Sequence, residues 1–132
     1  MSLIEAVKES EGFRSKVYKD TLGIDTIGYG FAIKDLVLEE DICDMILDRK
    51  LDKLINDANK RFSFLKDLPR DKSDVVYEMC YQLGINGVSK FKNMLKHLGA
   101  KNYAKASVEM LDSLWAKQTP NRAIKLSSQM KS

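Results

Sequence analysis

The first residues of the chain have a helical pattern with a clear start and a clear end. Ser2-Leu3-Ile4-Glu5 is a capping box, in which Ser2 caps the helix start and Glu5 reaches back. Gly12 supplies a stop signal, so the pattern predicts a helix over about 3–11. The apolar face of this helix consists of Leu3, Ile4 and Val7.

Between residues 13 and 30 the helical spacing gives way to short β-prone runs. Residues 17–18 and 26–27 are such runs, and a turn-forming segment separates them, which predicts a β-hairpin. Gly28 and Gly30 predict bends, or places where the backbone closely approaches a neighbour.

Helical spacing returns at about residue 38 and continues to the end of the chain. An apolar stripe with Asp and Glu crowded at its start predicts a long helix over about 38–60, roughly 30 Å in length. The stripe consists of Ile42, Met45, Ile46, Leu51, Leu54, Ile55, Ala58 and Phe62. After a loop at Pro69, shorter helices are predicted over about 73–83, 88–98 and 102–111, and Thr119-Pro120 is expected to cap and begin a last one. This order of elements predicts an α+β fold with a small N-terminal β-hairpin lobe, a long connecting helix and a helical C-terminal lobe.

The composition is that of a globular domain. The chain has 132 residues, 44% hydrophobic and 31% charged, which favours one domain and excludes collagen-like and disordered chains. It has no run of 18 uncharged apolar residues, and acidic residues stand where a signal peptide needs an apolar run. We therefore expect no stable membrane insertion, and synthesis in the cytoplasm without an export signal.

The two cysteines, Cys43 and Cys80, are too few for a disulfide framework or a cysteine zinc site. Both fall in helix-like apolar patterns, so we expect two buried thiols. No other metal or cofactor motif is evident, and we expect neither metal nor cofactor.

The net charge of +3 is unevenly distributed. Residues 1–66 carry 11 basic and 13 acidic side chains, whereas residues 67–132 carry 11 and 6. The C-terminal half therefore favours an anionic partner such as nucleic acid, a membrane surface or an acidic polymer. The charge alone does not choose among them.

Glu11 is the first candidate for chemistry. It lies seven residues after Ile4, within roughly 20° on the same helical face, so an acid continues an apolar stripe at the last turn of a helix. Partial burial and the negative helix end both disfavour the charged carboxylate, which suits a general acid. The alternative is a solvated Glu at a frayed helix end.

Asp20 and Thr26 are the next candidates, although each is also an ordinary turn or strand residue. If a three-residue loop, 21–23, closes the hairpin with Gly23 in the left-handed position, the two side chains share one face. A two-residue loop would place them on opposite faces. An Asp and a Thr side by side can hold one water, and an acid with a water-holding carboxylate is the equipment of an inverting glycoside hydrolase.

The spacing of these residues resembles a known signature. Glu11-Gly12-Phe13-Arg14-x-x-x-Tyr18-x-Asp20-x-x-Gly23-x-x-Thr26-Ile27-Gly28-x-Gly30 is similar to the motif of the T-even phage lysozymes, glycoside hydrolase family 24. Two later segments resemble other parts of that family in the same order. They are residues 81–95, with Tyr81-Gln82-Leu83-Gly84, and Trp115 with Gln118-Thr119-Pro120-Asn121-Arg122-Ala123.

The resemblance implies a single lysozyme-like domain and an activity on peptidoglycan. Its parts would be a β-containing lobe at about 12–36, a connecting helix at about 38–60, and a helical lobe of about 61–132 joined by the 3–11 helix. The active-site cleft would lie between the hairpin and the C-terminal helices. The implied enzyme is an N-acetylmuramidase, or endolysin, that cleaves the β-1,4 bond between N-acetylmuramic acid and N-acetylglucosamine with inversion.

Residue roles follow from the same resemblance. Glu11 would protonate the leaving oxygen, Asp20 and Thr26 would position the attacking water, and Arg122 would approach and orient Glu11. The residues expected in the substrate cleft are Gly30, Gln82, Trp115, Thr119 and Arg122. A lone Trp on a helical face is more often part of the core, so Trp115 has two readings.

The sequence departs from the family pattern in four ways. Phe31 stands where many members have His, which removes any ion pair there, and Ser10 replaces an acid, which would leave Arg122 fewer anionic partners. Only about seven residues separate Gly30 from the long helix, and the chain ends soon after Arg122. These last two departures predict a small N-terminal lobe and a shortened C-terminal packing segment.

Other functions are weighed against this one. The single histidine, His97, has no nucleophile nearby in sequence, which argues against a Ser-His-Asp or Cys-His site. A peptidoglycan-binding module that has lost turnover is the main alternative. A basic nucleic-acid binder lacks aromatic or arginine clustering on one helix face, and a lytic transglycosylase would need the acid but no water-holding partner.

The partner expected from this reading is a peptidoglycan glycan strand, with no nucleic acid. We expect a monomer that is made in the host cytoplasm and acts on the cell wall after a separate holin-like protein opens the inner membrane. Delivery from outside, on a virion or by a secretion machine, is the other route.

Overall fold

The computed structural model describes residues 2–132, and these residues form two compact units, Met1–Asp44 and Met45–Ser132. The N-terminal unit contains one helix and a small sheet, and the C-terminal unit is helical. The long helix α2, Glu40–Arg61, begins in the first unit and ends in the second. The α+β, lysozyme-like fold class is confirmed. The assignment of the 3–11 helix to the helical lobe stays a prediction.

Helix α1, Leu3–Glu11, has the bounds that the capping signals predicted. The backbone N–H of Glu5 donates to Ser2 Oγ at 3.1 Å, and the N–H of Ser2 donates to the Glu5 carboxylate at 3.4 Å. At the other end, Gly12 has φ +71° and donates its N–H to the carbonyl of Lys8. No residue of α1 is buried, so the partial burial expected for Glu11 is wrong.

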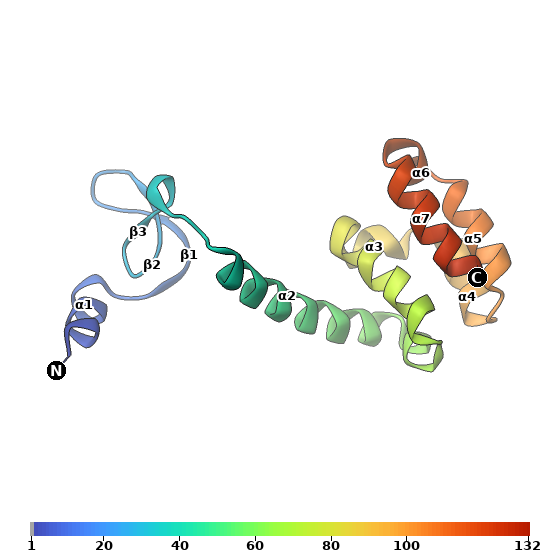
Figure 1. The fold of residues 1–132 in the computed structure, drawn as a ribbon, viewed down its shortest axis with the longest axis horizontal. Helices are drawn as coiled ribbons and strands as arrows, with labels where there is room; N and C mark the ends of the chain where they lie inside the picture. Colours follow the sequence, from blue (N-terminus) through green and yellow to red (C-terminus); the bar gives the residue numbers. More distant parts are fainter. Residues whose placement is uncertain (1) are drawn as a thin grey trace. The chain divides into compact units, whose positions relative to one another are not determined.

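Three antiparallel strands follow in the order β1-β2-β3: β1 is Arg14–Lys19, β2 is Asp25–Gly28 and β3 is Phe31–Ala32 (Figure 1). The central strand pairs Tyr18 with Thr26 on one side and Thr26 with Ala32 on the other. A bulge interrupts the β1–β2 pairing between Arg14 and Tyr18. The predicted hairpin is confirmed, and the third strand extends it.

The predicted long helix is confirmed as α2, Glu40–Arg61, with acidic residues in its first turn and basic residues in its last. Both complement the helix dipole. Short 3-10 turns occupy Ile33–Asp35 and Ser63–Asp67. Within residues 2–132, no helix combines the length and the apolar character needed to cross a bilayer.

The remaining helices are α3, Arg70–Ser89, α4, Lys92–Gly99, α5, Tyr103–Leu111, α6, Leu114–Gln118, and α7, Pro120–Lys131. Helix α7 packs against α3, α5 and α6, and α4 packs against α5 (Figure 1). The core of the C-terminal unit is built from aliphatic side chains, methionines and Trp115. Its largest fully buried members are Leu65, Met79, Met94, Leu98, Met110, Leu126 and Met130.

Three predictions about the helices and the cysteines need correction. The expected 88–98 helix begins only at Lys92, because Val88 belongs to a helical segment that follows a kink at Gly84 (φ +77°, ψ 160°). Thr119 precedes α7, but its hydroxyl donates backward to the carbonyl of Trp115 and does not cap the helix. Cys43 is exposed, so only Cys80 is a buried thiol, and its burial raises the pKa of that thiol to about 11.

Candidate active site

Glu11 is the last residue of α1, and the turn between β2 and β3 lies against its carboxyl group. Gly30 in that turn has φ +74°, and a Cβ built there would be only 2.9 Å from the carboxyl carbon of Glu11. A side chain at this position would therefore displace the Glu11 carboxyl group, which is the far end of a flexible, exposed side chain. Glycine is favoured here by its positive φ, and the space that it leaves is occupied by this carboxyl group.

Asp20 closes the hairpin with one of its carboxylate oxygens. The backbone N–H groups of Leu22 and Ile24 donate to Asp20 Oδ1 at 2.8 and 2.9 Å, and the N–H of Gly23 donates to the carbonyl of Asp20 at 3.0 Å. Gly23 has φ +78°, so the predicted three-residue loop with a left-handed glycine is confirmed. All the side-chain hydrogen bonds of Asp20 within residues 2–132 end on Oδ1, which leaves Oδ2 as an acceptor.

Thr26 is the one residue of the described part of the N-terminal unit that is fully buried, with 3% of its surface exposed. Its hydroxyl donates to the carbonyl of Ile24 at 2.8 Å. Because the hydroxyl proton is used in this bond, Thr26 Oγ1 can only accept a hydrogen bond from a further partner.

The register of the hairpin places Asp20 and Thr26 on one face of the sheet. Tyr18 pairs directly with Thr26. Beyond the end of β1, the N–H of Asp20 donates to the carbonyl of Ile24 at 3.0 Å, so the pairing continues and Asp20 starts from the same side as Thr26, with its Oδ1 turned into the loop. The face therefore presents two acceptors that can share one water molecule. Tyr18 itself lies beneath the guanidinium of Arg14, which is 4.7 Å from the ring centroid.

The other predicted cleft residues, apart from Gly30, belong to the C-terminal unit, where three of them form a hydrogen-bonded chain. The indole Nε1–H of Trp115 donates to Gln82 Oε1 at 2.9 Å, and the hydroxyl of Thr119 donates to the carbonyl of Trp115 at 2.9 Å. Trp115 is 4% exposed and packs edge-on against Phe91 at 6.1 Å. Trp115 is therefore part of the core, and it also lines a pocket of the C-terminal unit. Its place in a substrate cleft stays a prediction.

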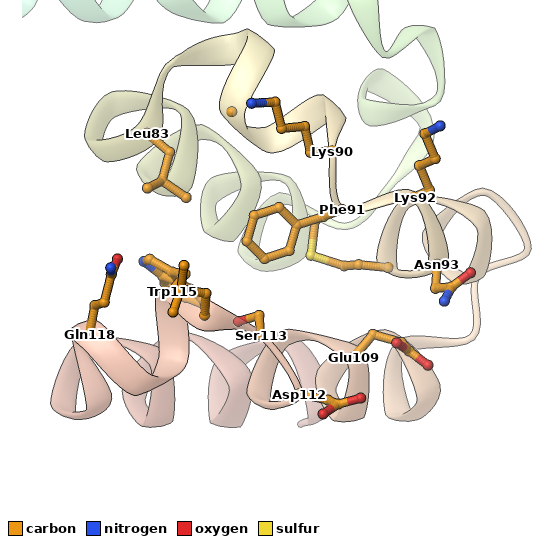
Figure 2. Close-up of a pocket in the computed structure, with 13 residues that line it drawn as sticks. Leu83, Lys90, Phe91, Lys92, Asn93, Glu109, Asp112, Ser113, Trp115 and Gln118 are labelled. Carbon is orange, nitrogen blue, oxygen red and sulfur yellow. The ribbon is translucent and has the colours of Figure 1, made fainter.

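We refer to this pocket as the C-terminal pocket (Figure 2). It has a volume of about 410 Å³, within the range of ordinary ligand sites. Its lining residues are Leu83, Gly87, Lys90, Phe91, Lys92, Asn93, Met94, Glu109, Asp112, Ser113, Leu114, Trp115 and Gln118. The pocket lies entirely within the C-terminal unit.

Arg122 has an anionic partner that the sequence did not reveal. Its Nε–H donates to Glu78 Oε2 at 3.1 Å, which joins α7 to α3. From the sequence, Arg122 was expected to have fewer anionic partners, because Ser10 stands next to Glu11 where the family often has an acid. Glu78 lies 44 residues away in the sequence, where only the folded chain brings it close.

The substitution of Phe31 for the expected histidine also has a structural counterpart. Phe13 and Tyr29 lie 5.4 Å apart between ring centroids, and Tyr29 and Phe31 lie 6.4 Å apart. The ammonium of Lys8 lies over the Tyr29 ring at 5.4 Å. These aromatic contacts hold the end of α1 and the β2–β3 turn together, next to Gly30.

Within residues 2–132, no three His, Cys, Asp or Glu side chains are grouped closely enough to hold a metal ion.

Comparison with known protein families identifies the family of this chain. The family profile described as phage lysozyme matches residues 8–129, almost the whole chain. The chain belongs to the phage lysozyme family. It is therefore a glycoside hydrolase of the lysozyme type, and its substrate is peptidoglycan.

Individual relatives agree with this assignment of a phage lysozyme. Probable T4-type lysozymes 1 and 2 of Dictyostelium discoideum are each 31% identical to it over 151 aligned positions, which cover 92% of this chain and 89% of theirs. The pre-baseplate central spike protein of Enterobacteria phage T4 is 30% identical over 155 positions, which cover 93% of this chain and 26% of that protein. Since the lysozyme described here has 132 residues, these alignments include positions that it lacks.

Proposed function

We propose that this lysozyme hydrolyses the β-1,4 bond between N-acetylmuramic acid and N-acetylglucosamine with inversion, using Glu11 as general acid and Asp20 with Thr26 to position water. The observation that carries the proposal is the hairpin register, which aligns Asp20 with Thr26 on one face. The placement of Glu11 against the Gly30 turn supports the role of the acid.

The proposed hydrolysis moves one proton from Glu11 to the leaving group and one from water to Asp20. The carboxylic acid of Glu11 gives its proton to the glycosidic oxygen as the bond to the anomeric carbon breaks. Water attacks the anomeric carbon from the opposite face and loses a proton to Asp20 Oδ2, the oxygen that the loop leaves available. Thr26 Oγ1 accepts a hydrogen bond from the other O–H of the water, which stays on the product, so the lone pair of the water points at the sugar.

The C-terminal residues are proposed as substrate contacts. Gln82, Trp115 and Thr119 form a connected, partly buried polar chain that is suited to recognising amide and hydroxyl groups. Arg122 is proposed as a positioning residue for the acid, and Glu78 holds its guanidinium in place.

The test is to analyse the products released from purified cell walls by wild type, Glu11→Gln and Glu9→Gln. Glu9 lies on the same exposed helix and serves as the matched control. Glu11→Gln is expected to lower kcat by roughly 10²–10⁴-fold while the melting temperature stays equal or rises, and Glu9→Gln is expected to resemble wild type. Near-full turnover by Glu11→Gln would remove the acid assignment.

The stereochemical outcome separates hydrolysis from its alternatives. NMR of fresh products should show the α-anomer, and mass spectrometry in ¹⁸O-labelled water should show one labelled oxygen per cleavage. A retained β-anomer would contradict inversion. An anhydro sugar without label would instead identify a lytic transglycosylase.

The route to the wall is a separate part of the proposal. We propose synthesis in the host cytoplasm and release through a membrane opened by another protein, as the family resemblance implies. Cells that express the chain should lyse only after the inner membrane is permeabilised, and lysis without permeabilisation would contradict this route.

A further inference from the structure

Tyr29 lies in the β2–β3 turn, directly before the glycine that lies against Glu11. Its half-buried ring is 5.4 Å from the ring of Phe13, with the two planes tilted by 51°, and 6.4 Å from the ring of Phe31, which it meets edge-on. The ammonium of Lys8 lies 5.4 Å from the centre of the same ring. All three contacts converge on Tyr29, and we call these four side chains the Tyr29 cluster.

The Tyr29 cluster joins the two segments between which the Glu11 carboxyl group lies. On the helix side, Lys8 is in the last turn of α1, and Phe13 follows two residues after Glu11. On the sheet side, the rings belong to the two residues that flank Gly30, the glycine against which the carboxyl group lies. No residue of α1 is buried. The ring contacts, and not a buried core, therefore attach this helix end to the turn.

The backbone of the turn is in close contact with both the cluster and the acid. Gly28 has φ +71°, and a Cβ built there would be 2.8 Å from two ring carbons of Phe31. At Gly30, a built Cβ would be 2.9 Å from the carboxyl carbon of Glu11. Because the ring and the acid contact the same short turn, a change in the packing of the rings would shift the turn relative to the acid.

The cluster supports the turn from behind the face that is proposed to hold water. Phe31 pairs with Ile27, and the neighbouring pair contains Thr26. Because successive side chains of a strand point to opposite sides, Phe31 and Thr26 project from opposite faces of the sheet. The ring of Tyr29 packs against Phe31. Removing that ring therefore takes no group from the water-holding face, and an effect on hydrolysis would have to act through the acid.

We propose that Tyr29 is a positioning residue for the hydrolysis, because its ring fixes the helix end that carries Glu11 against the β2–β3 turn. The proposal rests on the proposed function, since Glu11 is the acid of that reaction. The role belongs to the ring, because the contacts with Lys8, Phe13 and Phe31 all involve the ring. A misplaced acid slows the step in bound substrate, which lowers kcat and leaves KM nearly unchanged.

Two substitutions of Tyr29 test the ring on purified cell walls, at a temperature where circular dichroism shows each variant to be folded. Tyr29→Leu should lower kcat roughly 10–100-fold and change KM less than about twofold. Tyr29→Phe keeps the ring and should retain the wild-type kcat. A wild-type kcat in Tyr29→Leu, or an equal loss in Tyr29→Phe, would overturn the proposal.

The matched control is Tyr103→Leu. Tyr103 is also half-buried, and the ammonium of Lys72 lies 5.5 Å from its ring centre, but it belongs to α5 in the C-terminal unit. Tyr103→Leu should therefore lose the same kind of ring contact and keep the wild-type kcat. If its kcat falls as far as that of Tyr29→Leu, loss of ring packing in general, and not the position of the acid, explains the effect.

A double-mutant cycle shows whether Tyr29 acts through Glu11. In the Glu11→Gln background, measured at high enzyme concentration, Tyr29→Leu should lower the residual turnover no further, because no acid is left to misplace. A further loss of the size seen in the wild-type background would overturn the positioning role.

The ring contact itself can be measured without turnover. In the NMR spectrum of the full chain, the ε-methylene protons of Lys8 should be shifted upfield by the ring in wild type and Tyr29→Phe, and not in Tyr29→Leu. Absence of this shift in wild type would overturn the cluster. If Glu11→Gln is inactive but Tyr29→Leu keeps the wild-type kcat, the positioning proposal fails while the proposed hydrolysis stands. If Glu11→Gln keeps near-full turnover, the acid assignment itself fails.

Discussion

Asp20 carries its structural contacts and its proposed chemical role on different atoms. Its Oδ1 accepts two backbone N–H groups that close the hairpin loop, and its Oδ2 is the oxygen that we propose binds water. Substitutions can therefore separate the two tasks. Asp20→Asn keeps an acceptor oxygen for the loop but loses the basic carboxylate, whereas Asp20→Ala loses both.

We expect the free energy of unfolding of Asp20→Asn to lie within about 0.5 kcal/mol of the wild-type value, and its kcat to fall at least roughly 10²-fold. Asp20→Ala should lose the same activity and a further ~1–2 kcal/mol of folding free energy, because two backbone donors lose their acceptor. Urea unfolding and wall-clearing rates measure the two effects. Equal stability of the two variants would show that the carboxylate does not hold the loop.

Gly30 allows a second separation, between backbone strain and steric conflict. Gly30→Ala should destabilise the fold by about 1–2 kcal/mol, because φ is +74°, and should also displace the Glu11 carboxyl group. Since a displacement of about 1 Å can lower a rate 10²-fold, we expect a loss of kcat well beyond the loss of stability.

The control for this prediction is Gly84→Ala. Gly84 has nearly the same backbone angle, φ +77°, but a Cβ there would meet no atom within 4 Å. Gly84→Ala should be destabilised about as much as Gly30→Ala, but it should keep the wild-type kcat at a temperature where both variants are folded. Equal losses of turnover in both variants would show that strain alone, and not contact with Glu11, explains the effect.

Local spacing predicted the hairpin geometry well, because its causes lie close together in the chain. The loop that aligns Asp20 with Thr26 depends on Gly23 and on a register set within seven residues. The Glu78–Arg122 ion pair could not be found this way, because neither residue carries a local signal for the other. The same is true of the C-terminal pocket, whose lining residues come together only when α4 packs against α5.

Among the helices, signals at the helix ends were more reliable than lengths. Ser2, Gly12 and Pro120 each mark the helix end that was predicted. Gly84 interrupts α3 directly after the predicted 73–83 helix, but one more helical segment follows it before α4 begins at Lys92. Cys43 was expected to be buried from the apolar pattern of α2, yet in that helix only Ala58 is buried.

The last turn of α7 is attached to α3 by a buried lysine. The ammonium of Lys72 donates to the carbonyls of Gln129, at 2.7 Å, and of Ser132, and it pairs with Asp71 at 3.0 Å. Only 3% of Lys72 is exposed. This ammonium satisfies carbonyl groups that a helix end leaves without partners, which explains how α7 is held at its C-terminal end.

Replacing Lys72 should therefore weaken the C-terminal unit. Lys72→Met keeps the aliphatic stem and removes the ammonium, and we expect a loss of roughly 2–3 kcal/mol in urea unfolding. Lys125→Met, an exposed lysine on the same helix, should change stability by less than about 0.5 kcal/mol. Similar values for the two variants would mean that the buried contacts contribute no net stability.

For the chain as a whole, charge is divided between the two units more sharply than between the two sequence halves. Residues 1–44 carry 5 basic and 10 acidic side chains, and residues 45–132 carry 17 and 9. The N-terminal unit is therefore −5 and the C-terminal unit +8. The modest net charge of +3 conceals a strongly basic helical unit, which is the one expected to be attracted to an anionic cell wall.

This division predicts a salt-dependent activity whose origin lies in the C-terminal unit. Raising NaCl from about 0.02 to about 0.5 M should shorten the screening length from roughly 20 Å to about 4 Å and raise KM on cell walls several-fold.

Lys96→Gln with Lys105→Gln removes two exposed charges from the basic unit, outside the pocket, and should raise KM at low salt. Lys16→Gln with Lys34→Gln makes the same change in net charge on the acidic unit and should have a smaller effect. At high salt, both double variants should converge on wild type. If the two variants are equally impaired at low salt, net charge alone governs the attraction, and the separation of charge between the units has no role in it.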